Sequence, residues 1–146
     1  MNLIIRKMEL KDLEPLHRLL SDPEVMRYIE PPYTREQTAD FLNRCGLTDS
    51  PLVYAVDADG QFIGYVIYHD YDEKSMEIGW LLFPEHWGKG YASRLTDQLL
   101  SRAMHDSKDA VIECDPEQTV TINIARSHGF VYEGNRDGLD VFRYSL

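Results

Sequence analysis

Trp87-Gly88-Lys89-Gly90-Tyr91-Ala92-Ser93 is the stretch that decides the fold, because it leaves a predicted strand and enters a predicted helix. Two glycines let the backbone curl so that several N–H groups converge, and a helix N-terminus adds about half a positive charge. Such a loop suits an anion. A bare Gly-x-Gly also occurs as a turn that only starts a helix, so the flanking sequence has to separate the two interpretations.

The spacing around this loop argues against two common phosphate-binding patterns. A Walker loop built on Gly88-Lys89 needs glycine and a hydroxyl residue where this chain has Phe83 and Gly90. A Rossmann fingerprint places its third glycine on Ser93 and follows repeated βαβ units, whereas the preceding strands read as hairpins. Neither nucleotide fold is therefore expected.

The segments on either side of the loop predict a strand, a helix and a second strand. Met76–Phe83 reads as a strand ended by Pro84, with Gly79 indicating a bulge or a close backbone approach. The helix after Gly90 carries an apolar face, predicted as core: Tyr91, Leu95, Leu99 and Ala103, with Leu100 and Met104 beside them. Ala110–Cys114 follows, and a strand reached through a helix is expected parallel to the first, in a right-handed crossover.

The remaining sequence predicts one compact domain over residues 1–146. We expect a strand at 3–6, a helix capped by Asp12, a helix from the capping box Thr34–Gln37 to Cys45, and a hairpin at 52–68 turning at Asp59-Gly60. Pro116-Glu117 should open a last helix bearing Val120, Ile124 and Ala125 and capped by Gly129, before strands at 130–133 and 139–144. The prediction is a mixed, mostly antiparallel sheet of six to seven strands, flanked by about four helices.

The composition of the chain limits the classes of molecule that it is expected to bind. With 25 acidic and 15 basic residues the formal charge is −10, which repels phosphate backbones and favours cationic molecules, although acidity also simply aids solubility. Cys45 and Cys114 and five scattered histidines lack metal-ligand spacing, so no metal is expected. No apolar run is long enough for a membrane span or a signal peptide, so we expect a soluble, cytoplasmic protein that binds neither nucleic acid nor membrane.

The loop also resembles the pyrophosphate loop of the GNAT superfamily, written [Gln/Arg]-x-x-Gly-x-[Gly/Ala]. Gly90 and Ala92 match its last two defined positions, and Trp87 replaces Gln or Arg. Trp-Gly-Lys-Gly-Tyr-Ala, with Glu77–Trp80 before it, is similar to the branch of ribosomal-protein N-terminal acetyltransferases. Residues 116–130 resemble the family's Asn-x-x-Ser helix ending in Gly-Phe, with Gln118 and Thr121 at the Asn and Ser positions.

The resemblance implies a sheet in which the two parallel strands splay apart to admit the pantetheine arm of acetyl-CoA. Backbone groups of Leu81, Leu82 and Phe83 would pair with that arm. The diphosphate would lie on Trp87, Gly88, Lys89, Gly90, Tyr91, Ala92 and Ser93, and Gln118 would also contact the cofactor. For Lys89, we expect the backbone N–H to contact the diphosphate first. Its side chain would either contact the diphosphate as well or point into solvent.

Acetyl transfer to an amine requires a base, because alkyl amines have a pKa near about 10.4. Glu77 is the leading candidate, and the alternative is a strand glutamate that is solvated or paired with arginine. A backbone N–H near Leu81 or Leu82 would stabilise the oxyanion. Many family members place a tyrosine where this chain has Ala125, so Thr121 becomes the candidate for stabilising the departing thiolate, with protonation by solvent as the alternative.

The function predicted from the sequence is acetyl-CoA-dependent acetylation of a primary amine by direct attack. The acceptor is a protein N-terminus or a small cationic amine, bound by the first two helices, their connection at 24–33 and the loop at 134–138. Tyr28, Glu30 and Tyr33 are possible lining residues. Transfer of a longer acyl group and a catalytically weak acyl-CoA-binding or regulatory module are the alternatives, and a homodimer through exposed strands is possible.

Overall fold

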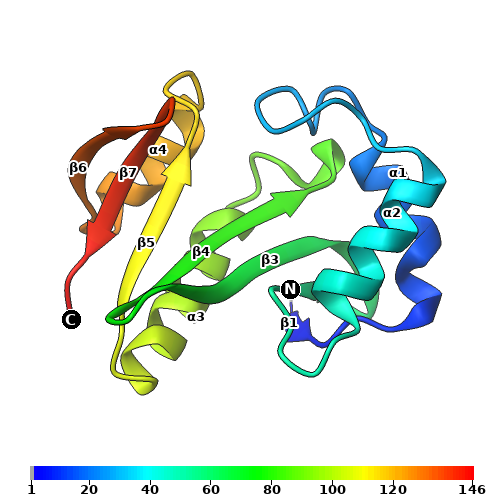
Figure 1. The fold of residues 1–146 in the computed structure, drawn as a ribbon, viewed down its shortest axis with the longest axis horizontal. Helices are drawn as coiled ribbons and strands as arrows, with labels where there is room; N and C mark the ends of the chain where they lie inside the picture. Colours follow the sequence, from blue (N-terminus) through cyan, green and yellow to red (C-terminus); the bar gives the residue numbers. More distant parts are fainter. Residues whose placement is uncertain (1) are drawn as a thin grey trace. The chain divides into compact units, whose positions relative to one another are not determined.

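A computed structural model describes residues 2–146 and contains a seven-stranded sheet in the order β1-β2-β3-β4-β5-β7-β6 (Figure 1). The chain divides into two compact units. The first comprises the residues up to Ile67 together with Trp80–Tyr91, and the second comprises Tyr68–Gly79 and Ala92–Leu146. The strands β3 and β4 and the helix α3 contribute residues to both units. The predicted mixed, mostly antiparallel sheet is confirmed.

The strands of the first unit form antiparallel pairs. β1 (Leu3–Arg6) pairs with β2 (Val53–Ala58), and β2 pairs with β3 (Gln61–Asp72). The β2–β3 hairpin turns on Asp59 and Gly60, whose φ values of 50° and 83° suit a two-residue turn with both residues left-handed. The predicted Asp-Gly reversal is confirmed.

Two helices and two irregular turns precede this hairpin: η1 (Leu10–Asp12), α1 (Leu13–Leu20), α2 (Arg35–Phe41) and η2 (Leu42–Gly46). α1 and α2 lie against each other (Figure 1). The capping box is present as predicted, because the Thr34 N–H donates to Gln37 Oε1 at 2.8 Å and the Gln37 N–H donates to Thr34 Oγ1 at 3.1 Å. The predicted continuation toward Cys45 is real but changes to wider π-helical turns after Phe41.

Asp12 does not cap α1, which corrects the prediction. Its carboxylate accepts the Glu9 N–H at 2.8 Å and two hydrogen bonds from Arg6, at 2.8 and 2.9 Å. Arg6 also reaches Asp57 on β2 at 2.8 Å. Burial alone would raise the pKa of Asp12, but the bonds from Arg6 and Glu9 hold it below its usual value. The side chain therefore ties β1 to the start of the helical segment instead of serving α1.

The core of the first unit lies where the helical faces meet β2 and β3. Its largest fully buried members are aliphatic, and the cluster also takes in the aromatic Tyr65 and Phe83. The cluster contains Met8, Leu16, Leu19, Leu20, Val25, Met26, Leu42, Val53, Ala55, Tyr65 and Phe83. Phe83 belongs to the connection between β4 and the glycine loop, so this core fixes one end of that loop.

Gly64 on β3 makes a close backbone approach, and the bulge or close approach expected at Gly79 stays a prediction. A Cβ at Gly64 would lie 2.0 Å from the Leu81 carbonyl oxygen and 2.9 Å from Leu82 Cα. Gly64 also adjoins an irregularity where β2 skips one residue of β3. Only glycine lets the end of β4 (Ser75–Leu82) pass this closely.

The second unit contains the predicted crossover. Ser75, Met76 and Glu77 pair in parallel with Asp109, Ala110 and Val111 at the start of β5 (Asp109–Cys114). α3 (Tyr91–His105) supplies the connection, and its predicted stripe of Tyr91, Leu95, Leu99 and Ala103 is buried, as is Leu100. Met104 is 46 % exposed, so its assignment to the core was wrong. The expected splaying of the two strands involves residues of both units and stays a prediction.

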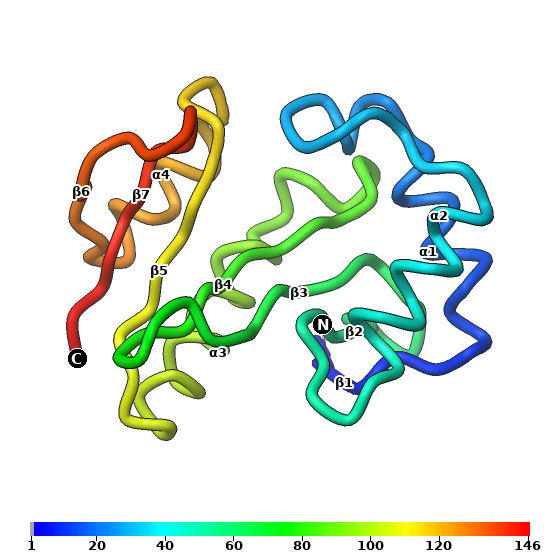
Figure 2. The backbone as a smooth tube through the Cα atoms, viewed as in Figure 1, coloured from blue at the N-terminus to red at the C-terminus, as the bar shows by residue number. Residues whose placement is uncertain are grey.

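The chain ends in two antiparallel strands after α4 (Thr119–Ser127), with β7 (Leu139–Tyr144) between β5 and β6 (Val131–Arg136) (Figure 2). The last helix begins at Thr119, three residues after Pro116, because Asp115 and Gln118 close a turn first. Its exposed Val120 and buried Ala125 show that only part of the predicted apolar face packs inward.

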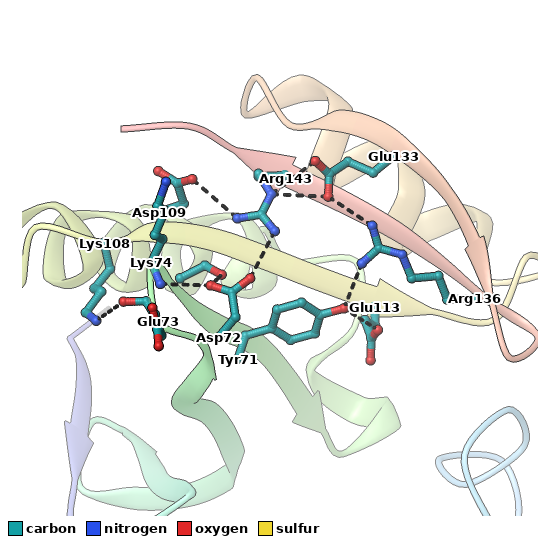
Figure 3. A network of polar contacts seen from close by, with 11 residues as sticks. Tyr71, Asp72, Glu73, Lys74, Lys108, Asp109, Glu113, Glu133, Arg136 and Arg143 are labelled. Atoms are coloured by element: carbon teal, nitrogen blue, oxygen red, sulfur yellow. Dashed lines mark hydrogen bonds and ion pairs between the residues drawn. The ribbon is translucent and has the colours of Figure 1, made fainter.

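Arg143 on β7 contacts carboxylates on three other segments of the second unit (Figure 3). Its guanidinium lies 3.1 Å from Glu133 on β6, 3.3 Å from Asp109 on β5 and 3.4 Å from Asp72 at the end of β3. Most of the Arg143 side chain is shielded from solvent, so these carboxylates balance a charge that burial would otherwise disfavour.

Candidate active site

The glycine loop has the curled backbone that the sequence predicted. Gly88 and Gly90 have φ values of 71° and 81°, in the left-handed region that favours glycine. A Cβ at either position would meet no atom within 4 Å in the described chain, so space lies open beside both. α3, which begins at Tyr91, has 15 residues. An open, left-handed glycine pair at the start of a long helix fits a bound diphosphate.

Trp87 anchors the loop to the end of β4. Its indole N–H donates to the Leu82 carbonyl at 2.9 Å, while 47 % of the residue is exposed. The Phe83 N–H donates to the Ile63 carbonyl at 3.1 Å, and both Leu82 and Phe83 are buried. The Leu82 carbonyl and the Phe83 N–H therefore already have partners inside the protein, a detail that the sequence did not reveal. Leu81 is only partly buried.

The other loop residues differ in exposure. Lys89 is exposed, whereas Tyr91 is buried, with its ring centroid 6.0 Å from that of His86. His86 Nδ1 is buried and has no hydrogen-bond partner among residues 2–146. Such an atom needs a partner from outside the chain, such as water or a bound ligand. Sequence reasoning missed His86, because nothing in its spacing marks it.

Ser93 in the first turn of α3 contacts the C-terminal end of α4. Its hydroxyl lies 3.3 Å from His128 Nε2, and His128 Nδ1 lies 2.8 Å from the Ile124 carbonyl. Because a carbonyl only accepts, Nδ1 carries a hydrogen and donates it to the Ile124 carbonyl. Asp97 Oδ1 is also 3.1 Å from Nε2. The ring is placed by the end of the helix, where Gly129 adopts φ 89° as the predicted cap.

Gln118 and Thr121 begin α4 in the same unit. Gln118 is the N-cap residue, and its Oε1 accepts the Asp115 N–H at 2.9 Å, which leaves the amide NH₂ as its remaining donor. Thr121 is partly buried in the first turn of the helix. Both residues therefore lie at the positive end of α4, just after β5, as the resemblance implied.

Glu77 is a partly buried carboxylate on β4, opposite Val111. Its Oε1 lies 3.8 Å from His69 Nε2, and His69 Nδ1 lies 2.9 Å from the Asp70 carbonyl. Nδ1 must donate to that carbonyl, so Nε2 is the ring nitrogen that faces Glu77. Burial raises the pKa of Glu77, His69 lowers it and Glu113 raises it, and the net effect is a raised pKa.

A second carboxylate, Glu113 on β5, lies on the same face as Glu77 and was missed at the sequence level. Glu77 pairs with Val111, and Glu113 follows two residues later, so both side chains leave the same side of the sheet. The Tyr71 hydroxyl donates to Glu113 Oε2 at 2.9 Å (Figure 3). The parallel register carries this information, but the sequence alone does not fix that register.

The connection between α1 and α2, together with α2 and η2, lines a cavity of about 360 Å³ within the first unit. The Tyr33 hydroxyl donates to Glu30, and Arg44 pairs with Asp40 at 2.8 Å. Burial and then Glu30 raise the pKa of Tyr33 to about 12. Glu30, Pro31, Pro32, Tyr33, Gln37, Asp40 and Arg44 line the cavity. Two of the three residues suggested by the sequence are present, and Tyr28 is not among them.

Among residues 2–146, no three His, Cys, Asp or Glu side chains gather as metal ligands would. Within the same residues, no helix has the length and apolarity needed to cross a membrane.

The family profile described as "Acetyltransferase (GNAT) domain" matches residues 2–131. The chain belongs to the GNAT acetyltransferase superfamily. It is 32 % identical to the uncharacterized N-acetyltransferase p20 of Bacillus licheniformis, across 99 % of this chain and 92 % of that protein. The family, and with it the activity class, is therefore established as acetyltransferase.

Two solved structures show the same fold. A GNAT-family acetyltransferase from Bacillus anthracis has a TM-score of 0.85 at 28 % identity, covering all of this chain and 95 % of that one. Spermidine N-acetyltransferase from Vibrio cholerae, solved with CoA and spermine, has a TM-score of 0.79 at 26 % identity, covering 97 % and 92 %. The GNAT fold predicted from the sequence is confirmed. These similarities do not distinguish the ribosomal-protein branch from other branches of the superfamily.

Proposed function

We propose that this chain uses acetyl-CoA to acetylate a primary amine, with residues 1–146 acting as one acetyltransferase domain. The observation that carries the proposal is the open pair of left-handed glycines, Gly88 and Gly90, at the start of the 15-residue α3. Backbone N–H groups from Trp87 to Ser93 would hold the diphosphate. Leu81, Leu82, Phe83 and Gln118 would contact the pantetheine arm, through groups other than the Leu82 carbonyl and the Phe83 N–H, which already have partners.

The chemistry needs one base and one group near the leaving sulfur. Bound acetyl-CoA supplies the acetyl carbonyl, where a C–N bond forms as the C–S bond breaks. Glu77 takes the proton that the attacking amine must lose, and its raised pKa makes it a better proton acceptor near neutral pH. A backbone N–H near Leu81 or Leu82 stabilises the oxyanion. Thr121, at the N-terminal end of α4, or solvent provides the hydrogen bond or proton that the thiolate needs.

The acceptor that we favour is a small polycationic amine. The formal charge of −10 attracts cations, and the cavity of the first unit is bordered by Glu30 and Asp40. The relative solved with spermine is a spermidine acetyltransferase. A protein N-terminus is the second candidate, because Trp87–Ala92 is similar to the ribosomal-protein branch. A cytosolic location would supply acetyl-CoA and either acceptor.

Calorimetric titration with acetyl-CoA, followed by thiol-release assays on spermidine and on a panel of peptide N-termini, tests the proposal. We expect saturable binding and turnover on spermidine. Glu77→Gln should bind acetyl-CoA as before and lose about 100-fold or more in kcat. The matched control is Glu73→Gln, an exposed glutamate at the β3–β4 turn.

Two results contradict the proposal. Binding without turnover on any amine would point to the regulatory module instead. Faster turnover on peptides than on spermidine would move the chain to the N-terminal acetyltransferase branch.

A further inference from the structure

A mostly buried histidine connects the end of α4 to the beginning of α3, and the proposed chemistry does not use it. His128 is the C-cap residue of α4, and only 11 % of its side chain is exposed. Its Nε2 lies 3.3 Å from the hydroxyl oxygen of Ser93, which is in the first turn of α3. Both residues belong to the second unit, so the contact lies within one compact body.

The ring of His128 is held on its other side by its own helix. Nδ1 lies 2.8 Å from the carbonyl oxygen of Ile124, one turn earlier in α4, and donates to it. The two nitrogens of an imidazole point in fixed directions, so this bond also sets the direction of Nε2. Nε2 is thereby aimed at Ser93.

The contact with Ser93 does not require a particular charge on the ring. A hydroxyl both donates and accepts, so it can pair with Nε2 whether or not that nitrogen carries a hydrogen. Asp97, one turn further along α3, has its Oδ1 3.1 Å from the same nitrogen, but 70 % of its side chain is exposed, and water and salt screen its charge. The partly buried contact with Ser93 is therefore the one that we take as the tie between the helices.

The position of Ser93 gives this tie a function. In the proposed function, backbone N–H groups from Trp87 to Ser93 hold the diphosphate of acetyl-CoA, and Ser93 is the last residue of that stretch. Donors that are already in place bind an anion without a further cost in conformational entropy. Fixing the side chain of Ser93 therefore helps to fix the end of the diphosphate site before the cofactor arrives.

We infer that His128 is a positioning residue for acetyl-CoA, which holds Ser93 and the first turn of α3 in place for the diphosphate. The inference rests on the proposed function, because it needs the diphosphate to bind at that turn. It assigns no contact between His128 and the cofactor, since the ring acts through Ser93.

Two substitutions at position 128 separate this role from simple termination of α4. In His128→Asn the amide replaces the Nδ1 side of the ring and can still donate to the Ile124 carbonyl, but it is too short to reach Ser93. In His128→Gln the amide extends to the Nε2 side and can pair with the hydroxyl. In calorimetric titrations with acetyl-CoA, His128→Asn should weaken binding about three- to tenfold, roughly the value of one hydrogen bond, and His128→Gln should restore most of it. A residue that only ends the helix would accept asparagine at least as well as glutamine, because asparagine occurs at helix C-termini.

A double-mutant cycle assigns the effect to the Ser93 contact. Ser93→Ala should weaken binding by the same factor as His128→Asn, and the double variant should be no weaker than either, because both remove one interaction. Ser101→Ala and His105→Asn are the matched controls, since both residues are exposed and lie on later turns of α3. Steady-state assays should show the same pattern in the KM for acetyl-CoA, with kcat changed less than about twofold.

Nitrogen-15 NMR of the imidazole side chains supplies a readout that does not depend on binding. The His128 signals, identified by their loss in His128→Gln, should show a hydrogen on Nδ1. Ser93→Ala should shift the Nε2 signal and leave Nδ1 protonated. A His128 ring with no hydrogen on Nδ1 would contradict the geometry and overturn the inference.

The outcomes separate the inference from the function that it deepens. If the wild-type protein binds acetyl-CoA and both His128→Asn and Ser93→Ala bind it equally well, the inference is overturned and the proposed function stands. Additive losses in the double variant would also overturn the inference. Wild-type protein that does not bind acetyl-CoA would overturn both. Should His128→Asn fail to fold, the comparison of Ser93→Ala with Ser101→Ala still decides, because each removes only one hydroxyl.

Discussion

Gly64→Ala is expected to be the most damaging small substitution in β3, and the structure gives the size of the effect. The new Cβ would lie 2.0 Å from the Leu81 carbonyl oxygen, whereas ordinary C···O contacts begin near about 3.3 Å. The end of β4 would have to move by roughly 1.3 Å to relieve the clash. Overpacking of this kind costs about 1–3 kcal/mol, and the glycine-only backbone at φ 153° adds about 1–3 kcal/mol more. The total expected loss is about 2–6 kcal/mol.

Urea unfolding followed by circular dichroism measures this loss, with Gly60→Ala as the control. Gly60 has φ 83° and no atom within 4 Å of its added Cβ in the described chain, so it pays only backbone strain of about 1–2 kcal/mol. The unfolded-state effect of replacing glycine by alanine is the same in both variants. If the two variants differ by less than about 1 kcal/mol, the close approach of β4 at Gly64 is not real, and the reasoning fails.

Two further predictions concern the loop and the pH dependence of stability. Gly90→Ala should raise the KM for acetyl-CoA at least about tenfold, because the strained loop would present its N–H groups less well. The control Gly138→Ala, with the similar φ of 87°, should leave this KM unchanged. Equal KM values for the two variants in steady-state assays would show that the loop does not bind acetyl-CoA. Hydrogen bonds from the Ser75 hydroxyl and the Lys74 N–H, with Arg143 beside them, lower the pKa of Asp72 to about 2. This depressed pKa stabilises the fold above about pH 4, where an unfolded aspartate is ionised, and the contribution is lost as pH falls toward about 2. The difference in urea midpoint between wild type and Asp72→Asn should therefore shrink over that range, and a constant difference would refute the assignment.

Local chemistry explains which parts of the fold could be predicted. The reversal at Asp59-Gly60, the capping box at Thr34 and Gln37 and the cap at Gly129 each depend on residues only a few positions apart. A turn or cap is decided by backbone dihedrals and near hydrogen bonds, so the sequence contains the necessary information. The crossover from β4 to β5 was also predictable, because a strand, an amphipathic helix and a strand admit few arrangements.

The errors concern contacts that the spacing of residues along a single helix or strand does not reveal. Asp12 was expected to cap a helix, but Arg6 offers it stronger, charge-assisted hydrogen bonds. Met104 continues the apolar spacing of α3 but lies near the end of the helix and remains exposed. For the proposed site, Glu77 was suggested by its strand, whereas Glu113 and Tyr71, 42 positions apart, meet only once the sheet has formed. Periodicity assigns faces but not the partners across strands.

Ala125 occupies the position in α4 where many family members have a tyrosine. Ala125 is fully buried, and its carbonyl accepts the Phe130 N–H at 3.0 Å at the capped end of α4, so this position offers no side-chain hydroxyl. The lack of a tyrosine hydroxyl at this position has a smaller effect on the chemistry than the need for a base. At pH 7 an alkyl amine with pKa about 10.4 resists deprotonation by about 4.6 kcal/mol, whereas protonating a thiolate with pKa about 8.5 is favourable by about 2 kcal/mol. The base is therefore the more demanding requirement, and in our proposal Glu77 meets it. The leaving thiolate can be left to Thr121 or to water.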